Sequence, residues 1–411
     1  MDKKLTINSK RLFSHITKLG EIGRLPGGGI TRLALTNEDM RARELVKTYM
    51  QEAGLSVTQD SAGNIIGRLE GQNKDMPVIM TGSHIDTVLD GGAFDGALGV
   101  LGAIEALQTM KEQGIKPDHP IEAVIFTDEE GTRFNLNFVG SRAVAGTFKE
   151  EYLDYKDAQN ITLREAMQKA GLQLEKIHSA QKQNVKCFLE LHIEQAKVLE
   201  ENNLPAGIVT GIAGPLWLKF TLNGQAGHAG ATPMHMRKDP LPVALDIIQY
   251  IFSQVAENDG VVGTVGRIEA FPGGINIIPE RVEFTLDLRD IDEQTIDKIQ
   301  KNIYSYVEKS NSQNKVQTQV QVTQKVAPVK CSEEIINKSK VVFEELALQP
   351  FQLMSGAGHD GMNFKELCPI GMIFVRSQKG LSHHREEWTT EEDCAIGTEI
   401  LYRTLLSLDK S

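Results

Sequence analysis

The sequence predicts an α/β protein in which a larger domain, with a mixed sheet and helices on both faces, is interrupted by a smaller α+β domain. Within 78–127 an apolar run, an amphipathic stretch and a second apolar run follow one another, which is typical of a β-α-β unit. In the middle of the chain the pattern changes to alternating apolar and polar residues, as in half-exposed antiparallel strands. We therefore expect the larger domain at 1–208 and 329–411 and the smaller domain at 209–328.

Helices and strands alternate along the larger domain. Helical stripes at 9–19 and 37–53 are each followed by a glycine, Gly20 and Gly54, which suits a helix end. The other elements expected in this domain are strands at 55–57, 64–69, 78–81, 121–127, 187–193 and 370–375 and helices at 97–113, 141–145, 163–170, 333–346 and 391–408.

The smaller domain has its own signals. Strict alternation at 216–222 and 281–288 predicts strands with one buried face, and helices are expected at 242–254 and 295–310. The dipeptide Asn223-Gly224 is typical of a hairpin turn.

Composition narrows the class of protein. The chain has 411 residues, 40% hydrophobic and 24% charged, with a net charge of -11 that disfavours nucleic acid and anionic membranes as partners. Its four cysteines are far apart, as expected for free thiols in a reducing compartment. The N-terminus lacks the apolar core of a signal peptide, and no stretch reaches the length of a membrane span. We expect a cytoplasmic protein with neither a nucleic-acid nor a membrane partner.

Histidines and carboxylates follow several of the apolar strands. They are His84, Asp86, Asp95, Glu129, Glu130, His192, Glu194 and His383. Imidazole and carboxylate without thiolate suit Zn²⁺, Mn²⁺ or Co²⁺, and the set is too large for one catalytic ion but fits two. Taken singly, a strand-end histidine or an acidic pair is more often solvated surface. Several independent strands ending in such residues favour a metal site.

Spacing within this set suggests separate roles. In a strand, His84 and Asp86 would point the same way, so we expect the Asp86 carboxylate to accept the second ring N–H of His84. Asp95 lies among glycines that let the backbone crowd a metal, and it is the natural bridging ligand. Glu129 and Glu130 are adjacent, so we expect one to bind metal and the other to transfer protons.

Nine short motifs carry a resemblance to a known family. They are GSHIDTV at 82–88, GGAFDG at 91–96, FTDEEGTRF at 126–134, ELHIEQ at 190–195, GHAGATPM at 227–234, PGGINIIPE at 272–280, DLRD at 287–290, SGAGHD at 355–360 and SHHREEW at 382–388. Together they resemble the dinuclear metal amidohydrolases of the aminoacylase/carboxypeptidase (M20) clan, in the branch of N-carbamoyl-L-amino acid hydrolases and allantoate amidohydrolases. The resemblance covers nearly the whole chain.

The resemblance implies roles for individual residues. Two divalent ions, Zn²⁺ or else Mn²⁺, Co²⁺ or Ni²⁺, are expected on one set of ligands: His84, Asp95 as the bridge, Glu130, His192 and His383. His383 is preferred to His384 because the family places its ligand directly after the serine. Glu129 is the implied general base, with Asp86 beside the first ligand as a further catalytic residue.

Substrate contacts are implied as well. The expected set is Gln195, His228, Asn276, Arg289, Gly356 and His359. Similar enzymes are homodimers in which the histidine of the GHAG motif, here His228, stabilises the oxyanion in the partner's site. Without the resemblance, an arginine at the position of Arg289 is more often a salt-bridge partner, although its guanidinium is a good fork for a substrate carboxylate.

The expected activity is metal-dependent hydrolysis of the carbamoyl C–N bond of an N-carbamoyl-L-amino acid, giving the L-amino acid, ammonia and CO₂. Pro215 stands where some allantoate amidohydrolases have a substrate-binding glutamine, which favours the carbamoyl-amino acid branch. Allantoate hydrolysis, a dipeptidase or N-acyl-amino acid deacylase activity, and an inactive binding homologue are the alternatives.

Overall fold

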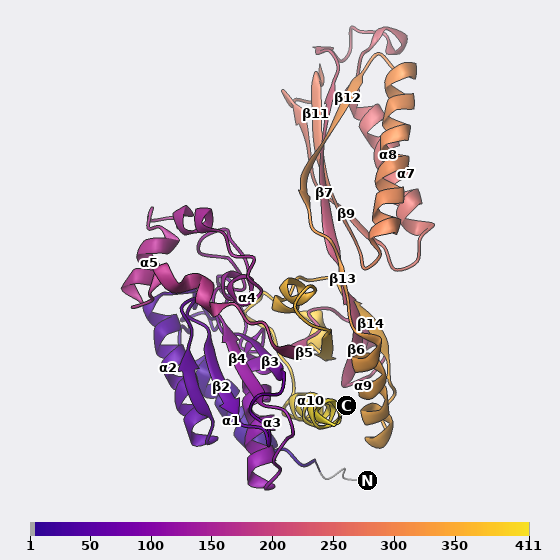
Figure 1. The fold of residues 1–411 in the computed structure, drawn as a ribbon. Helices are drawn as coiled ribbons and strands as arrows, with labels where there is room; N and C mark the ends of the chain where they lie inside the picture. Colours follow the sequence, from indigo (N-terminus) through magenta and orange to yellow (C-terminus); the bar gives the residue numbers. More distant parts are fainter. Residues whose placement is uncertain (1–4, 411) are drawn as a thin grey trace. The chain divides into compact units, whose positions relative to one another are not determined.

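The computed structural model describes residues 5–410. Their contacts divide the chain into two compact units, one made of the residues up to Gly211 together with those from Lys330 onward, and the other of Ile212–Val329. Each unit is described by itself below (Figure 1).

A nine-stranded mixed sheet forms the centre of the larger unit. Its strand order is β1-β2-β4-β3-β5-β15-β6-β13, with β14 beside β6. The pairs β3–β4, β3–β5 and β5–β15 are parallel, whereas β1–β2, β2–β4 and β6–β15 are antiparallel. The strands are β1 (Ser56–Gln59), β2 (Ile65–Leu69), β3 (Val78–His84), β4 (Ile121–Phe126), β5 (Val185–Ile193), β6 (Ala206–Ile212), β13 (Val329–Lys330), β14 (Gln352–Ser355) and β15 (Ile370–Val375).

Helices cover both faces of this sheet. The layer on one face consists of α1 (Ser9–Gly20), α2 (Asn37–Glu52), α3 (Ala97–Glu112), α9 (Glu333–Glu345) and α10 (Glu391–Asp409), which pack on one another. A Cβ added at Gly102 of α3 would lie 2.9 Å from Leu191 Cδ2 of β5. Phe188, three residues earlier in β5, instead packs against Phe364 with ring centroids 5.0 Å apart. Residues three apart in a strand project to opposite faces, which confirms the prediction of helices on both sides.

Shorter helices lie on the face that Phe188 contacts. They include α4 (Val139–Val144) and the 3-10 turn η4 (Asp360–Phe364), which contact each other. The remaining short elements of this unit are η1 (Glu150–Asp154), α5 (Leu163–Lys169), η2 (Leu174–Ala180), α6 (Val198–Glu201) and η5 (Gln378–Gly380). The sequence did not predict β6 and β14.

The smaller unit is a four-stranded antiparallel sheet with two helices on one face. The order is β12-β7-β11-β9. Its strands and helices are β7 (Gly214–Asn223), α7 (Pro240–Ala256), β9 (Val262–Phe271), β11 (Arg281–Asp290), α8 (Glu293–Gln313) and β12 (Gln317–Lys325), and the minor elements are β8 (Gly227–His228), η3 (Met234–Met236) and β10 (Ile277–Ile278). The two edge strands, β9 and β12, were not predicted; β9 has no buried position and β12 has one, so neither has a regularly buried face.

Two further properties concern the chain as a whole. None of the helices within residues 5–410 combines the length and the apolarity needed to cross a membrane. All four cysteines are buried and free. Burial raises the pKa of Cys187, Cys331 and Cys368 to about 12, so these thiols stay protonated at neutral pH.

Candidate metal centre and active site

The predicted site residues gather where the parallel strands of the large sheet end. His84 is the last residue of β3, residues 127–130 follow β4, and His192 lies near the end of β5. The strand register pairs His84 with Phe126 and His192 with Phe374. Because parallel strands end at the same edge of a sheet, this register brings side chains from distant parts of the sequence together.

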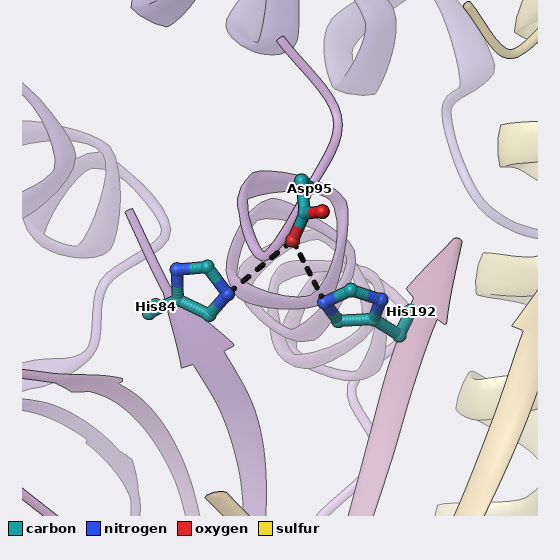
Figure 2. Close-up of side chains that lie close together, drawn as sticks. All are labelled: His84, Asp95 and His192. Carbon is teal, nitrogen blue, oxygen red and sulfur yellow. Dashed lines mark ion pairs between the residues drawn. The ribbon is translucent and has the colours of Figure 1, made fainter. Parts of the chain in front are cut away.

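Asp95 lies among three of the predicted histidines. One of its carboxylate oxygens faces His84 and His192, and the other faces His383. Its Oδ1 is 3.5 Å from His84 Nε2 and 3.2 Å from His192 Nε2 (Figure 2). Its Oδ2 is 3.5 Å from His383 Nε2, which is also 3.4 Å from Glu130 Oε1. The carboxylate therefore belongs to two donor groups at once, as expected of a bridging ligand.

The hydrogen bonds of the two buried histidines fix which ring nitrogen faces Asp95 with a lone pair. His84 Nδ1 lies 3.0 Å from the carbonyl oxygen of Asp86, and His192 Nδ1 lies 2.9 Å from that of Ile193. A carbonyl can only accept, so each Nδ1 carries a proton and Nε2 is the ring nitrogen that is directed to Asp95 and can offer a lone pair to a metal ion. Buried lone pairs and carboxylate oxygens that converge in this way are stabilised by a cation among them.

Asp86 differs from its prediction. Its carboxylate lies 3.8 Å from His84 Nδ1, too far for a hydrogen bond, and its backbone carbonyl takes that position instead. The reason is that β3 ends at His84, so the alternation of side chains in a strand no longer applies two residues later. The carboxylate accepts the backbone N–H groups of Glu129 at 3.3 Å and Glu130 at 3.2 Å. Asp86 thus supports the acidic turn as well as His84.

Glu129 and Glu130 each approach a different histidine most closely, although both have a carboxylate oxygen in one group with His84. Glu129 Oε2 lies 3.6 Å from His84 Nε2, whereas Glu130 is directed to His383. The turn depends on Asp128, whose φ of 53° lies in the left-handed region. Burial raises the pKa of both glutamates well above the ordinary value. Carboxyls in this state are stabilised as anions when positive charge is brought to the site.

Two glycines of the loop before α3 make room for the site. A Cβ at Gly96, whose φ is 62°, would lie 2.5 Å from the His84 ring. A Cβ at Gly92 would lie 2.2 Å from Glu387 Oε1. The glycines were expected to let backbone approach a metal. The structure shows that they leave space for the His84 ring and for a buried glutamate.

Gln195, predicted as a substrate contact, holds Asp95 here. Its Nε2 donates to Asp95 Oδ2 at 2.8 Å, and its own φ is 62°. Its Oε1 is buried without a hydrogen-bond partner among the residues from 5 to 410. One end of the amide therefore orients Asp95, and the other end is available to a ligand.

Gly356 and His359 have unequal surroundings. A Cβ at Gly356 would meet nothing within 4 Å, so the space around this residue is open. His359 is only 2% exposed; its ring packs on that of His192 with centroids 4.5 Å apart, and its Nε2 lies 2.9 Å from Ser355 Oγ. His359 therefore supports His192 directly, and its ring is not presented to solvent.

Three predicted residues belong to the smaller unit. His228 and Asn276 are neighbours there, because β8 pairs with β10 and the Ala229 N–H donates to the Asn276 carbonyl at 3.0 Å. Arg289 is paired with Asp287, with Nε 3.0 Å from Oδ1 and an Nη 2.8 Å from Oδ2. Arg289 therefore forms a salt bridge, as the alternative interpretation had it, and its partner Asp287 lies in the same strand.

Sequence reasoning overlooked Ser382 and Glu387 as parts of the site. Ser382 Oγ is 2.6 Å from Asp95 Oδ2, and Glu387 is 4% exposed beneath the same loop. Burial, followed by the charge of Asp95, raises the pKa of Glu387 to about 7. Both residues lie in a polar run, 382–388, that resembles solvated surface. Their only signal was proximity to His383.

The donors gathered here fit a divalent metal ion. The groups with converging ligand atoms include His84, Asp95 and His192 on one side and Asp95, Glu130 and His383 on the other. Nitrogen and carboxylate donors without thiolate are the set that zinc and similar ions bind in catalytic sites.

Comparison with known proteins agrees with this geometry. Residues 80–407 match the model of "Peptidase family M20/M25/M40". The chain is 50% identical over 404 residues, 98% of this chain and 99% of the relative, to an N-carbamoyl-L-amino acid amidohydrolase of Geobacillus stearothermophilus. It is 35% identical to an allantoate amidohydrolase of Bacillus subtilis, over 98% of this chain and 99% of the relative.

A solved structure supports the same family assignment. An amidase of the hydantoinase/carbamoylase family from Burkholderia multivorans superposes with a TM-score of 0.93, at 32% identity and with 98% of each chain covered. The sheet-edge donor set, the match over most of the sequence and the agreement of the whole fold lead to one conclusion: the chain belongs to peptidase family M20/M25/M40, among its amidohydrolases.

Proposed function

We propose that this protein hydrolyses the carbamoyl C–N bond of N-carbamoyl-L-amino acids. Water adds to the carbamoyl carbon, the bond to the amino acid nitrogen breaks, and the carbamate released decomposes to ammonia and CO₂. The observation that carries the proposal is the division of the Asp95 oxygens between His84 and His192 on one side and His383 on the other. The 50% identity to a relative named for this activity supports the choice of substrate.

Two divalent ions are proposed, zinc or else manganese, cobalt or nickel. His84, Asp95 and His192 would hold one, and Asp95, Glu130 and His383 the other. When bound, such ions supply a water of lowered pKa and positive charge for the carbamoyl oxygen.

Glu129 is the proposed general base. It is 6% exposed, and its Oε2 lies 3.6 Å from His84 Nε2, so it reaches the centre without belonging to the Asp95–His383 group. A buried carboxylate at this position takes a proton from the attacking water and delivers it to the leaving nitrogen. The neighbouring Glu130 is the proposed ligand.

His228 is the proposed oxyanion donor. Its Nδ1 accepts the backbone N–H groups of Gly230 at 3.1 Å and Ala231 at 3.3 Å. The neutral ring therefore carries its proton on Nε2, which is left as a donor. We propose that this donor serves the site of a second copy of the chain in a homodimer.

The substrate carboxylate is the proposed partner of Arg289 and Asn276. Asp287 holds the Arg289 guanidinium through two nitrogens, which orients the fork before substrate arrives. Pro215 lies directly opposite Arg289 in the β7–β11 pairing, so both project from the same face of the sheet. An apolar ring beside the arginine favours an N-carbamoyl-L-amino acid over allantoate, whose second ureido group needs a hydrogen-bonding partner.

Substrate comparison tests the activity. The chain is freed of metal, reloaded separately with zinc, manganese, cobalt or nickel, and assayed for ammonia release from N-carbamoyl-L-methionine and allantoate and for cleavage of a dipeptide. We expect N-carbamoyl-L-methionine to give the highest kcat/KM. Faster ammonia release from allantoate would reassign the substrate, and turnover of the dipeptide alone would refute carbamoyl hydrolysis.

Subunit mixing tests the homodimer. Glu129→Gln and His228→Ala are each expected to be inactive, because the first removes the general base from every site and the second removes the oxyanion donor. Mixed and re-equilibrated, they should regain about one quarter of wild-type activity, since half of the dimers are mixed and one of their two sites is intact. A mixture that stays inactive while subunit exchange is verified would show that His228 does not act across an interface.

A further inference from the structure

The 382–388 loop contains a buried glutamate, Glu387, and a partly buried serine, Ser382, in addition to the exposed His383. We infer that Glu387 and Ser382 are positioning residues that hold Asp95 and His383 in one fixed arrangement. The inference rests on the proposed metal centre and adds to it a second layer that decides how tightly an ion binds at the His383 side.

Glu387 fixes the backbone of the loop that carries Asp95. Its Oε1 accepts the N–H groups of Phe94 at 2.9 Å and Asp95 at 3.1 Å. These bonds join parts of the chain 293 and 292 residues apart, and the glutamate is 4% exposed. Hydrogen bonds from backbone N–H groups to a buried carboxylate are among the stronger ones in proteins. The Asp95 loop is therefore held at its backbone.

Ser382 fixes the Asp95 side chain. Its Oγ lies 2.6 Å from Asp95 Oδ2 and 3.1 Å from Glu387 Oε2. A hydroxyl has one proton, and the shorter contact identifies Asp95 as its acceptor. With the Gln195 amide at 2.8 Å, Oδ2 receives two donors that set the rotation of the carboxylate. Oδ2 is the oxygen that faces His383.

The chain around this pair is built to accommodate it. Only a glycine fits at position 92, where a Cβ would lie 2.2 Å from Glu387 Oε1. Next to Glu387, the Trp388 ring packs edge-on against Phe94, with centroids 5.3 Å apart, and against Phe13, at 5.8 Å. The loop is thus fastened to the Asp95 segment by polar bonds and by aromatic packing.

His383 needs such support more than the other histidines do. Its side chain is 50% exposed and its φ is 55°, a left-handed conformation that a non-glycine residue keeps only where its surroundings impose it. His84 and His192 lie in hydrogen-bonded strands, and backbone carbonyls fix their Nδ1 atoms. Outer-layer partners of metal ligands change metal affinity by about 10- to 100-fold when they are removed.

Glu387→Ala and Glu387→Gln form the central test. Alanine removes both the N–H acceptor and the contact to Ser382. Glutamine keeps them, because its carbonyl oxygen can accept both N–H groups and its amide can donate to Ser382 Oγ. We expect the alanine variant to bind the weaker of two zinc ions about 10- to 100-fold less tightly and the glutamine variant to bind it within a few-fold of wild type. Binding is measured by competition with a chromophoric chelator.

Glu399→Ala is the matched control. Glu399 is fully buried in α10, and its Oε2 accepts the N–H groups of Thr6 at 2.7 Å and Ile7 at 3.1 Å. The Glu399→Ala variant thus loses two backbone N–H bonds to a buried carboxylate, as Glu387→Ala does, and also the bond from Arg403 Nε at 2.8 Å, all of them away from the site. We expect lower thermal stability without a change in zinc affinity. Ser382→Ala is the milder companion if Glu387→Ala fails to fold, and it should weaken the same ion in the same direction.

The outcomes separate the inference from the proposed function. Wild-type affinity for both ions in Glu387→Ala and Ser382→Ala, or an equal loss in Glu399→Ala, would overturn the positioning role. A wild-type chain that binds no divalent ion would refute the metal centre and this inference with it. A wild-type chain that binds two ions, weakened as expected in Glu387→Ala, but does not hydrolyse N-carbamoyl-L-methionine would refute the proposed activity and support the positioning role.

Discussion

The two sides of the candidate metal centre are built in different ways. His84 and His192 project from neighbouring parts of one sheet, are 2% and 1% exposed, and have Nδ1 fixed by backbone carbonyls. His383 comes from a loop, has a half-exposed side chain, and depends on its neighbours for its backbone conformation. The two strand residues are thus held by strand register and by backbone carbonyls, whereas the residue on a loop depends on side chains of the same loop. Three experiments test this contrast.

Replacing each of the two adjacent glutamates by glutamine should have the largest effect on turnover and metal content. Glu129 is directed to the strand side and Glu130 to the loop side. We expect Glu129→Gln to retain both ions and lose about 10²- to 10⁴-fold in kcat, because it removes proton transfer and no ligand. Glu130→Gln should instead lose an ion. Metal content and kcat measured on the same samples decide this, and near-wild-type turnover of Glu129→Gln would eliminate it as the base.

Removing one histidine from each side should have the second-largest effect, on thermal stability and on ion affinity. His192→Ala takes a buried ring from the sheet edge, so we expect it to lower the thermal unfolding temperature as well as the affinity of the first ion. His383→Ala should leave the unfolding temperature of the metal-free protein nearly unchanged and weaken one ion more than tenfold, at least as much as loss of an outer-layer partner. Equal destabilisation of the two metal-free variants would contradict the contrast between strand and loop.

Graded chelation should give the smallest effect, because it changes no residue. We expect zinc to leave in two phases, the ion at the exposed His383 side first, with a rapid loss of activity in the first phase. His383→Ala should lack that phase and keep the slow one. Release of both ions in a single phase from the wild type would show that the two sides do not differ in affinity.

Most elements of the larger unit, and the histidines and carboxylates that gather at its sheet edge, could be predicted from sequence because the signals are local. Apolar runs and helical stripes follow from burial of one face, and a histidine or carboxylate directly after such a run must lie at a sheet edge. The edge strands β9 and β12 were missed because they have almost no buried position, so burial imposes little pattern on them. The Asp86 carboxylate was misplaced because the end of β3 at His84 cannot be read from the residues alone.

By itself, the sequence determined which histidines and carboxylates follow the buried strands, since burial of a strand selects an apolar run and polar residues mark where that run ends. Only the tertiary structure decided which oxygen of Asp95 faces which histidine, that the carbonyl of Asp86 fixes the His84 ring, and that Glu387 reaches back 292 residues to the Asp95 N–H. Those features depend on contacts between segments far apart in the chain, and no local pattern records them. A buried glutamate and a solvated one look the same until the fold places a backbone N–H beside one of them.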